Sequence, residues 1–245
     1  MNKVIAFSVW GADPKYLHGC EQNIIIAKKI YAGWQTRFYC AQDVPKSTVA
    51  HLADMGAEII NMQYIQSAWE GLFWRFLPAS DSDVDIFISR DIDSRLNERE
   101  YVAVEEWLAS NKDIHCMRDH IEHNVPMLGG MWGCRNHALQ DMKNWLDFWH
   151  NKNYKGCDQD FLRTVVFEPF IDNVLCHDRF HSGLAVEGGV QRQPYNRELY
   201  NYEYASGRKP DYHYLPIEFF GEHEIRPFPS HATMNYGYHV GEIIG

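Results

Sequence analysis

The 245-residue sequence has no long apolar run, no CxxC pair, no internal repeat and no low-complexity segment. A membrane-spanning helix needs about 20 consecutive apolar residues, so no integral membrane segment is expected. The first apolar run, Val4 to Trp10, is too short and too soon broken by Gly11 and Pro14 for a signal peptide. It is typical of a buried strand that leads into a loop.

The cysteines are few and widely spaced, and their pattern matches neither a zinc site nor a disulfide scaffold. A reduced, cytoplasmic protein is therefore expected. Positive charge is also scarce, because 23 Lys and Arg stand against 33 Asp and Glu, for a formal net charge of −10. Such a surface repels phosphate backbones, so we expect no nucleic-acid partner. The six cysteines are Cys20, Cys40, Cys116, Cys134, Cys157 and Cys176.

Apolar residues make up 45% of the chain, enough to fill the core of a single α/β domain of residues 1–245. Short apolar runs alternate with amphipathic segments, which predicts a mainly parallel central sheet with helices on its faces. Residues 127–133 fit either a strand or a tight glycine-containing loop, and residues 186–245 are expected to form a loop-rich extension. Strands are predicted over 4–10, 36–40, 58–62 and 84–89, and helices over 20–31, 47–55 (capped by Ser47), 69–78 (ended by Pro78), 98–110, 139–149 and 159–166.

Two carboxylates, Asp91 and Asp93, follow the strongly apolar run VDIFIS. Ligands of open α/β sheets bind at the carboxyl ends of strands, and two acids spaced by one residue can share one Mg²⁺ or Mn²⁺. Such a cation neutralises the charge of a departing nucleoside diphosphate. Arg75, in the preceding helix, could hold a phosphate or a carboxylate with forked geometry. The alternative interpretation of Asp91 and Asp93 is a capped turn with solvated acids. The alternative interpretation of Arg75 is an ordinary salt bridge.

Three later segments carry residues suited to the same kind of site. Gly129 and Gly130 allow a ligand to approach the backbone closely, although a plain turn is the commoner use of paired glycines. Asp158 and Gln159 precede an apolar helix, where acids are also favoured for the helix start alone. His239 lies near the C-terminus, where an imidazole could complete a metal site or simply be structural or solvated.

The order of these segments resembles that of retaining glycosyltransferases of the GT-A fold, most closely family 8, the glycogenin and bacterial galactosyltransferase type. The matching segments are, in order, AFSVWGAD, WRFLP, RDID, LGGMWG, DQDFL and HVGE, from about Val4 to Glu242. Each motif is weak by itself, and the specificity lies in their order. The strings FWRFLPASD and RDIDSRL are also similar to small viral and bacterial GT-A enzymes that build surface glycans.

The resemblance implies a Rossmann-like GT-A fold and a metal-dependent glycosyltransferase. Such an enzyme moves a hexose-type sugar from a nucleotide sugar, here a UDP-sugar, to a glycan or another hydroxyl acceptor, with retention of anomeric configuration. The extension of residues 186–245 would then complete the active site. The implied residues are Asp91, Asp93 and His239 for Mn²⁺ or Mg²⁺, Phe7, Ser8 and Trp10 for the base and ribose, Arg75, Asp91, Gly129 and Gly130 for the donor, and Asp158 and Gln159 beneath the anomeric carbon as catalytic residues.

Two other functions stay open at this point. A metal-dependent hydrolase is suggested by a set of histidines and aspartates whose spacing could support a metal cluster, although no HExxH pattern is present. A non-catalytic nucleotide- or sugar-binding module is suggested by the many aromatic residues, although such a module would usually lose the paired acids. The histidines and aspartates concerned are His115, Asp119, His120, His123, His177, Asp178 and His181.

Overall fold

The structure is a computed structural model that describes residues 1–63, 69–118, 125–149, 154–178, 208 and 210–213. The chain divides into two compact units, which are described one at a time. The first unit comprises Met1–Asn97 and Gly133–Asp158, and the second comprises Glu98–Trp132 and Gln159–Gly245.

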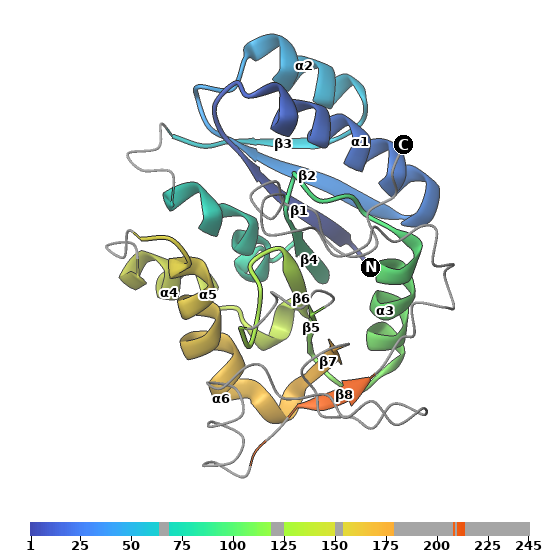
Figure 1. The fold of residues 1–245 in the computed structure, drawn as a ribbon, viewed down its shortest axis with the longest axis vertical. Coiled ribbons are helices and arrows are strands. Elements are labelled where there is room, and N and C mark those ends of the chain that lie inside the picture. The colour runs from blue at the N-terminus through green and yellow to red at the C-terminus, as the bar shows by residue number, and fades with distance from the viewer. Residues whose placement is uncertain (64–68, 119–124, 150–153, 179–207, 209, 214–245) are drawn as a thin grey trace, which may run out of the picture. The chain divides into compact units, whose positions relative to one another are not determined.

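The first unit is built on four parallel strands joined by helices (Figure 1). Their order is β3-β2-β1-β4, so the chain starts in the interior of the sheet and β1 pairs in parallel with both β2 and β4. The elements in chain order are β1 (Lys3–Val9), α1 (Pro14–Ile30), β2 (Trp34–Cys40), α2 (Lys46–Asp54), β3 (Glu58–Asn61), the 3₁₀ helix η1 (Glu70–Ser80) and β4 (Ile86–Arg90).

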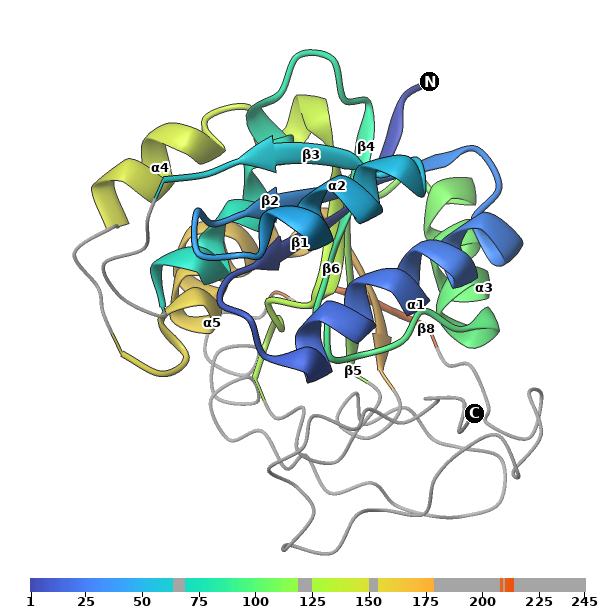
Figure 2. The ribbon, with the colours of Figure 1, turned by 90° about the horizontal axis from the view of Figure 1, so that it is seen from above.

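Helices cover both faces of these strands. Figures 1 and 2 show α1 and α2 on one face and η1 on the other. Strands β1, β2 and β4 are therefore largely buried on both sides, whereas β3 at the end of the row is only partly buried. Strand β1 carries an almost continuous apolar run because neither of its faces meets water. The remaining elements of this unit, η2 (Asn136–Ala138) and α4 (Met142–Trp149), follow β6 (Met131–Arg135), which begins in the second unit and ends in the first.

The second unit contains three further parallel strands in the order β5-β7-β8. Its helix α3 contributes Ala103 to a buried cluster with Met117 and Met131. A short helix, α5, begins in the first unit with Cys157 and Asp158 and continues directly into a π-helical segment of the second unit, η3. The bounds are α3 (Glu98–Ala109), β5 (Ile114–Arg118), α5 (Cys157–Phe161), η3 (Leu162–Phe167), α6 (Glu168–Phe170), η4 (Ile171–Asn173), β7 (Val174–Asp178) and β8 (Asp211–His213).

The α/β fold with a mainly parallel sheet, predicted from the alternation of strands and helices, is confirmed. All four predicted strands are present within two residues of their expected bounds. Among the described helices, none has the length and apolar character needed to cross a membrane. The six cysteines are free thiols and are buried.

Several local predictions were wrong. Helix α1 begins at Pro14, six residues before the expected start, because Asp13 caps it and its carboxylate accepts from the Lys15 N–H at 2.9 Å. Ser47 lies inside α2, whose cap position is Pro45 and has no side-chain hydrogen bond. Pro78 lies inside η1, which continues to Ser80.

The prediction of one domain over residues 1–245 stays a prediction. Most of the expected extension, residues 186–245, lies outside the described residues.

Candidate functional site

The candidate site lies at the carboxyl ends of β1 and β4. Because these strands are parallel neighbours, with Ala6 paired with Ser89, the residues that follow them emerge at the same edge of the sheet. Ser8 and Trp10 come from the end of β1, and Asp91 and Asp93 come directly after β4. This edge is where ligands of open parallel sheets bind.

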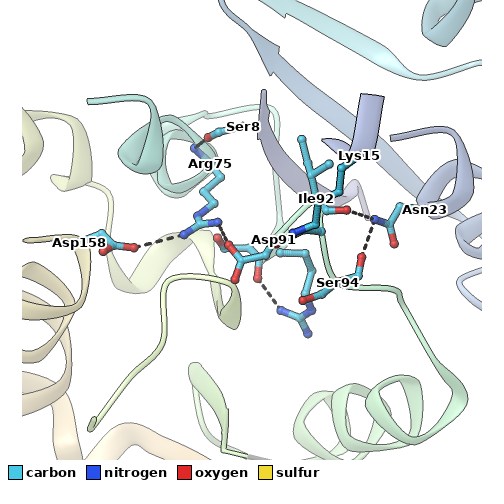
Figure 3. A network of polar contacts seen from close by, with 11 residues as sticks. Ser8, Lys15, Asn23, Arg75, Asp91, Ile92, Ser94 and Asp158 are labelled. Atoms are coloured by element: carbon cyan, nitrogen blue, oxygen red, sulfur yellow. Dashed lines mark hydrogen bonds and ion pairs between the residues drawn. The ribbon is translucent and has the colours of Figure 1, made fainter. Parts of the chain in front are cut away.

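Arg75 joins two of the predicted acids (Figure 3). Its guanidinium donates to Asp91 Oδ1 through Nη1 and to Asp158 Oδ2 through Nη2, the latter at 3.2 Å. The Arg75 and Asp158 side chains are 6% and 7% exposed, whereas Asp91 is 31% exposed. The planar fork of Arg allows one side chain to serve two carboxylates. Residues 91 and 158, far apart in the sequence, thus meet on one cation.

Burial and charge act in opposite directions on Arg75. Removal of the guanidinium from water lowers its pKa, but the nearby charges of Asp91, Asp158 and Asp93 raise it, and the net pKa is raised above the usual value for arginine. Arg75 is therefore a permanent positive charge. Its own backbone N–H donates to Ser8 Oγ at 3.0 Å, which ties η1 to the end of β1.

Asp93 has a different cationic partner, Lys15. The Lys15 ammonium lies 3.2 Å from Asp93 Oδ2, and the two side chains are 38% and 23% exposed. Lys15 is the second residue of α1, so the capped start of that helix determines where the ammonium lies. Both acids of the DxD pair are thus matched by a basic side chain, and both retain partial access to solvent.

The loop that carries the DxD pair is held by α1. The Asn23 side chain is fully buried, donates to the carbonyls of Ile92 at 3.3 Å and Ser94 at 2.9 Å, and accepts from the Leu96 N–H at 3.1 Å. Gly19 lies so close that a Cβ there would be 2.3 Å from the Ile92 carbonyl oxygen. This helix therefore fixes the backbone between Asp91 and Asp93.

The three residues predicted to line a base and ribose pocket differ in their surroundings. Phe7 is fully buried and stacks on Phe38, with 5.0 Å between ring centroids. Ser8 is 8% exposed and accepts from Arg75. Trp10 packs on the backbone of η1, since a Cβ on Gly71 would lie 2.7 Å from its ring. Ser8 contacts Arg75 and Trp10 contacts η1, whereas the ring of Phe7 belongs to the core.

The other predicted site residues lie in the second unit or outside the described residues. Gly129 and Gly130 are buried in a turn just before β6. Residues 127–133, for which the sequence allowed a strand or a loop, thus form a turn followed by the start of a strand. Gln159 is partly exposed in α5, directly after Asp158. His239 lies outside the described residues.

The histidines of the hydrolase alternative form a hydrogen-bonded pair in the second unit. His115 Nε2 and His177 Nδ1 are 2.9 Å apart, and His177 Nε2 is 3.0 Å from Glu106 Oε2. Both nitrogens of His177 are therefore engaged within the protein, and the His115 ring stacks on Trp107. In the described part of the chain, no group of three or more His, Cys, Asp or Glu side chains could hold a metal ion. Asp119, His120, His123 and His181 lie outside it.

Lys15, Gly19 and Asn23 were not identified from the sequence. The Asp13-Pro14 pair is a standard helix start, with a capping acid and a proline in the first turn, and it would have placed all three in one helix. A glycine inside a helix often marks close packing, and a buried asparagine in an apolar helix needs hydrogen-bond partners. These signals predict contact with some partner, and the structure identifies it as the DxD loop.

No protein-family model and no curated protein matches the chain. Solved structures are similar to it at low sequence identity. A glycosyltransferase involved in glycosylation of the major capsid of PBCV-1 is 12% identical over 74% of this chain and 84% of that one, with a TM-score of 0.48. The galactosyltransferase LgtC, in complex with donor and acceptor sugar analogs, is 13% identical over 95% and 93%, with a TM-score of 0.49.

A third similar structure is 4-diphosphocytidyl-2C-methyl-D-erythritol synthase from Anaerococcus prevotii, which is 9% identical over 77% of this chain and 93% of that one, with a TM-score of 0.45. Glycosyltransferases and a synthase are thus both similar to this chain. This similarity assigns neither an activity nor a substrate to this chain.

Proposed function

We propose that this chain is a metal-dependent glycosyltransferase that moves a hexose-type sugar from a UDP-sugar to a hydroxyl of a glycan or another acceptor, with retention of anomeric configuration. The observation that carries the proposal is the contact of Arg75 with both Asp91 and Asp158. It supports the sequence resemblance, because three motifs of that resemblance, WRFLP, RDID and DQDFL, meet in one charged cluster.

The residues of the DxD pair fit a divalent cation. Asp91 and Asp93 are oxygen donors, partly exposed, on a short loop whose backbone is fixed by Asn23. Magnesium is usually held by one or two carboxylates together with substrate phosphates and water, so two acids from the protein suffice. Bound there, Mn²⁺ or Mg²⁺ would neutralise charge on the departing diphosphate. His239 is proposed as a further ligand from the sequence resemblance alone.

The other residues are proposed to have distinct roles. Trp10 and Ser8, at the end of β1, are proposed to contact the nucleoside, and Arg75 the donor. Asp158 is proposed to stabilise the positive charge that develops at the anomeric carbon, since a fixed carboxylate in a buried site is effective electrostatically. Gln159 is proposed for the opposite face of the sugar, and Gly129 and Gly130 for its approach to the backbone.

In a retaining transfer of this kind, the acceptor hydroxyl attacks from the face that the diphosphate leaves. The leaving phosphate oxygen can accept the proton of that hydroxyl, so no dedicated protein base is required. An inverting enzyme would instead need an acid such as Asp158 as general base. The anomeric configuration of the product therefore separates two roles for the same carboxylate.

The metal part is tested with Asp93→Asn and a matched control, Asp83→Asn, which alters an exposed acid in the turn that leads into β4. Thermal unfolding is followed with UDP, with and without Mn²⁺. We expect UDP to stabilise the wild type and Asp83→Asn only when Mn²⁺ is present, by about 2.7 kcal/mol at a hundredfold excess over Kd, and not to stabilise Asp93→Asn. Equal stabilisation of the wild type in EDTA would remove the cation from the proposal.

The transfer is tested with Asp158→Asn against Asp160→Asn, the acid two residues later, which is 43% exposed and faces Arg163. With a labelled UDP-sugar, Asp158→Asn should lower kcat far more than it weakens UDP binding, because its contribution strengthens in the transition state. Asp160→Asn should change neither. NMR of the first-formed product gives the configuration, and inversion would reassign Asp158 as the base.

A further inference from the structure

The ion pair between Lys15 and Asp93 affects how a metal cation can bind to the DxD acids. In the structure, the DxD acids are each matched by a basic side chain, Asp91 by Arg75 and Asp93 by Lys15. A metal cation that binds these acids must therefore share the carboxylates with Arg75 and Lys15, or displace one of these basic side chains. Like charges within a few ångströms repel one another, and partial burial weakens the screening by solvent.

The two basic side chains are not equally able to move. Arg75 is buried and is also held by Asp158, so it stays in place. Lys15 is 38% exposed, has no second carboxylate among its described contacts, and carries its ammonium on a flexible stem with three donors. Its backbone is fixed by the capped first turn of α1, whereas its ammonium contacts Asp93 and lies 5.2 Å from the centroid of the neighbouring Tyr16 ring, so no buried contact holds it. Of the two, Lys15 is the residue that can change partner.

The charges explain what the new partner would be. The three carboxylates Asp91, Asp93 and Asp158 face Arg75 and Lys15, and the guanidinium of Arg95 donates to carbonyls of the same loop, so these six side chains together carry no net charge. A divalent cation alone would make this group positive, whereas a divalent cation with a diphosphate would not. The released ammonium would then lie beside phosphate oxygens, which are the acceptors that Lys commonly binds.

We propose that Lys15 couples metal binding to nucleotide binding. Without ligand it neutralises Asp93 and disfavours binding of the cation alone. When the cation and the diphosphate bind together, Lys15 leaves Asp93 and contacts the diphosphate. This inference rests on the proposed function, since it takes a nucleoside diphosphate as the ligand of the site, and it assigns to Lys15 a positioning and binding role that the sequence motifs did not indicate.

The experiment measures binding of Mn²⁺ and of UDP separately. Free Mn²⁺ is followed by electron paramagnetic resonance during titration of the wild type, Lys15→Gln, Lys15→Arg and Lys29→Gln, and UDP binding is followed by calorimetry at saturating Mn²⁺. Lys29→Gln is the matched control, because it removes the same charge from an exposed position in the last turn of the same helix. Circular dichroism confirms that each variant retains the fold.

The expected result is a change of opposite sign in the two affinities. Lys15→Gln should bind Mn²⁺ alone about two- to fivefold more tightly than the wild type. This range is the free energy of a partly exposed ion pair converted into a ratio of affinities. With Mn²⁺ present, Lys15→Gln should bind UDP at least about fivefold more weakly, because a charge-assisted contact to phosphate is lost. Lys15→Arg should have affinities for Mn²⁺ and for UDP close to those of the wild type. Lys29→Gln should have the same two affinities as the wild type.

Failure of the inference and failure of the proposed function give different results. If the wild type binds Mn²⁺ and UDP together but Lys15→Gln changes neither affinity, or changes both in the same direction, Lys15 does not couple them. If the wild type does not bind UDP at any Mn²⁺ concentration, the nucleoside diphosphate is the wrong ligand and the proposed function falls, and the coupling role of Lys15 falls with it.

Discussion

The contact of Arg75 with Asp91 and Asp158 makes a quantitative prediction about stability. We consider Arg75→Met, which keeps an apolar stem of similar length and removes the charge. The Arg75 side chain is 6% exposed and that of Asp158 is 7% exposed. Loss of the guanidinium therefore leaves the buried Asp158 carboxylate without the cation that faces it. Breaking a buried pair in this way costs about 3–5 kcal/mol. The lower value, about 3 kcal/mol, is expected here because Asp91, the second partner, is 31% exposed and can be hydrated.

The assay is a double-mutant cycle with Asp158→Asn. That single change leaves Arg75 paired with Asp91 and should cost about 1–2 kcal/mol. In the double variant no buried charge at position 158 needs compensation, so the combined cost should fall short of the sum by about 1–3 kcal/mol. For a chain of this size, Arg75→Met should lower Tm by roughly 6–12 °C.

Thermal and urea unfolding of the four proteins at pH 7 measure these values. The matched control is Arg163→Met, because Arg163 is 34% exposed and lies 3.6 Å from the exposed acid Asp160. A cost below about 1 kcal/mol for Arg75→Met, or strict additivity with Asp158→Asn, would refute the assignment of Arg75 as the buried cation of this cluster.

Two further predictions follow from the packing of α1 and β2. Gly19→Ala would place a Cβ 2.3 Å from the Ile92 carbonyl oxygen, so it should displace the DxD loop. We expect a marked loss of Mn²⁺-dependent UDP affinity with only a small decrease in Tm. Unchanged UDP affinity would show that the loop can shift without losing ligand binding. Burial raises the pKa of Cys20 to about 12 and that of Cys40 to about 12, whereas the thiols of the unfolded chain ionise from about 9. The unfolded state then loses protons first, so the free energy of unfolding should decline as pH rises from about 9 towards 12, and urea midpoints at pH 8 and 10 should differ less in Cys20→Ala and Cys40→Ala.

Local sequence signals were sufficient wherever a segment's neighbours along the chain decide its structure. The apolar runs that became β1 and β4 and the alternation of strands with helices predicted the mainly parallel sheet, and the position of Asp91 and Asp93 after an apolar strand placed them at its carboxyl edge. Strands β5 and β7 were not predicted. Their buried residues include His115 and His177, which break the apolar run that a strand buried on both faces normally shows.

The sequence by itself determined the fold class and the identity of the acids at the candidate site, because both depend on periodicity and on order along the chain. Only the tertiary structure decided which cation faces which acid. Arg75 meets Asp158 across 83 positions and Lys15 meets Asp93 across 78, and no periodic pattern connects residues so far apart. These pairs arise because parallel strands bring their carboxyl ends to one edge, where the start of α1 and the middle of η1 also lie.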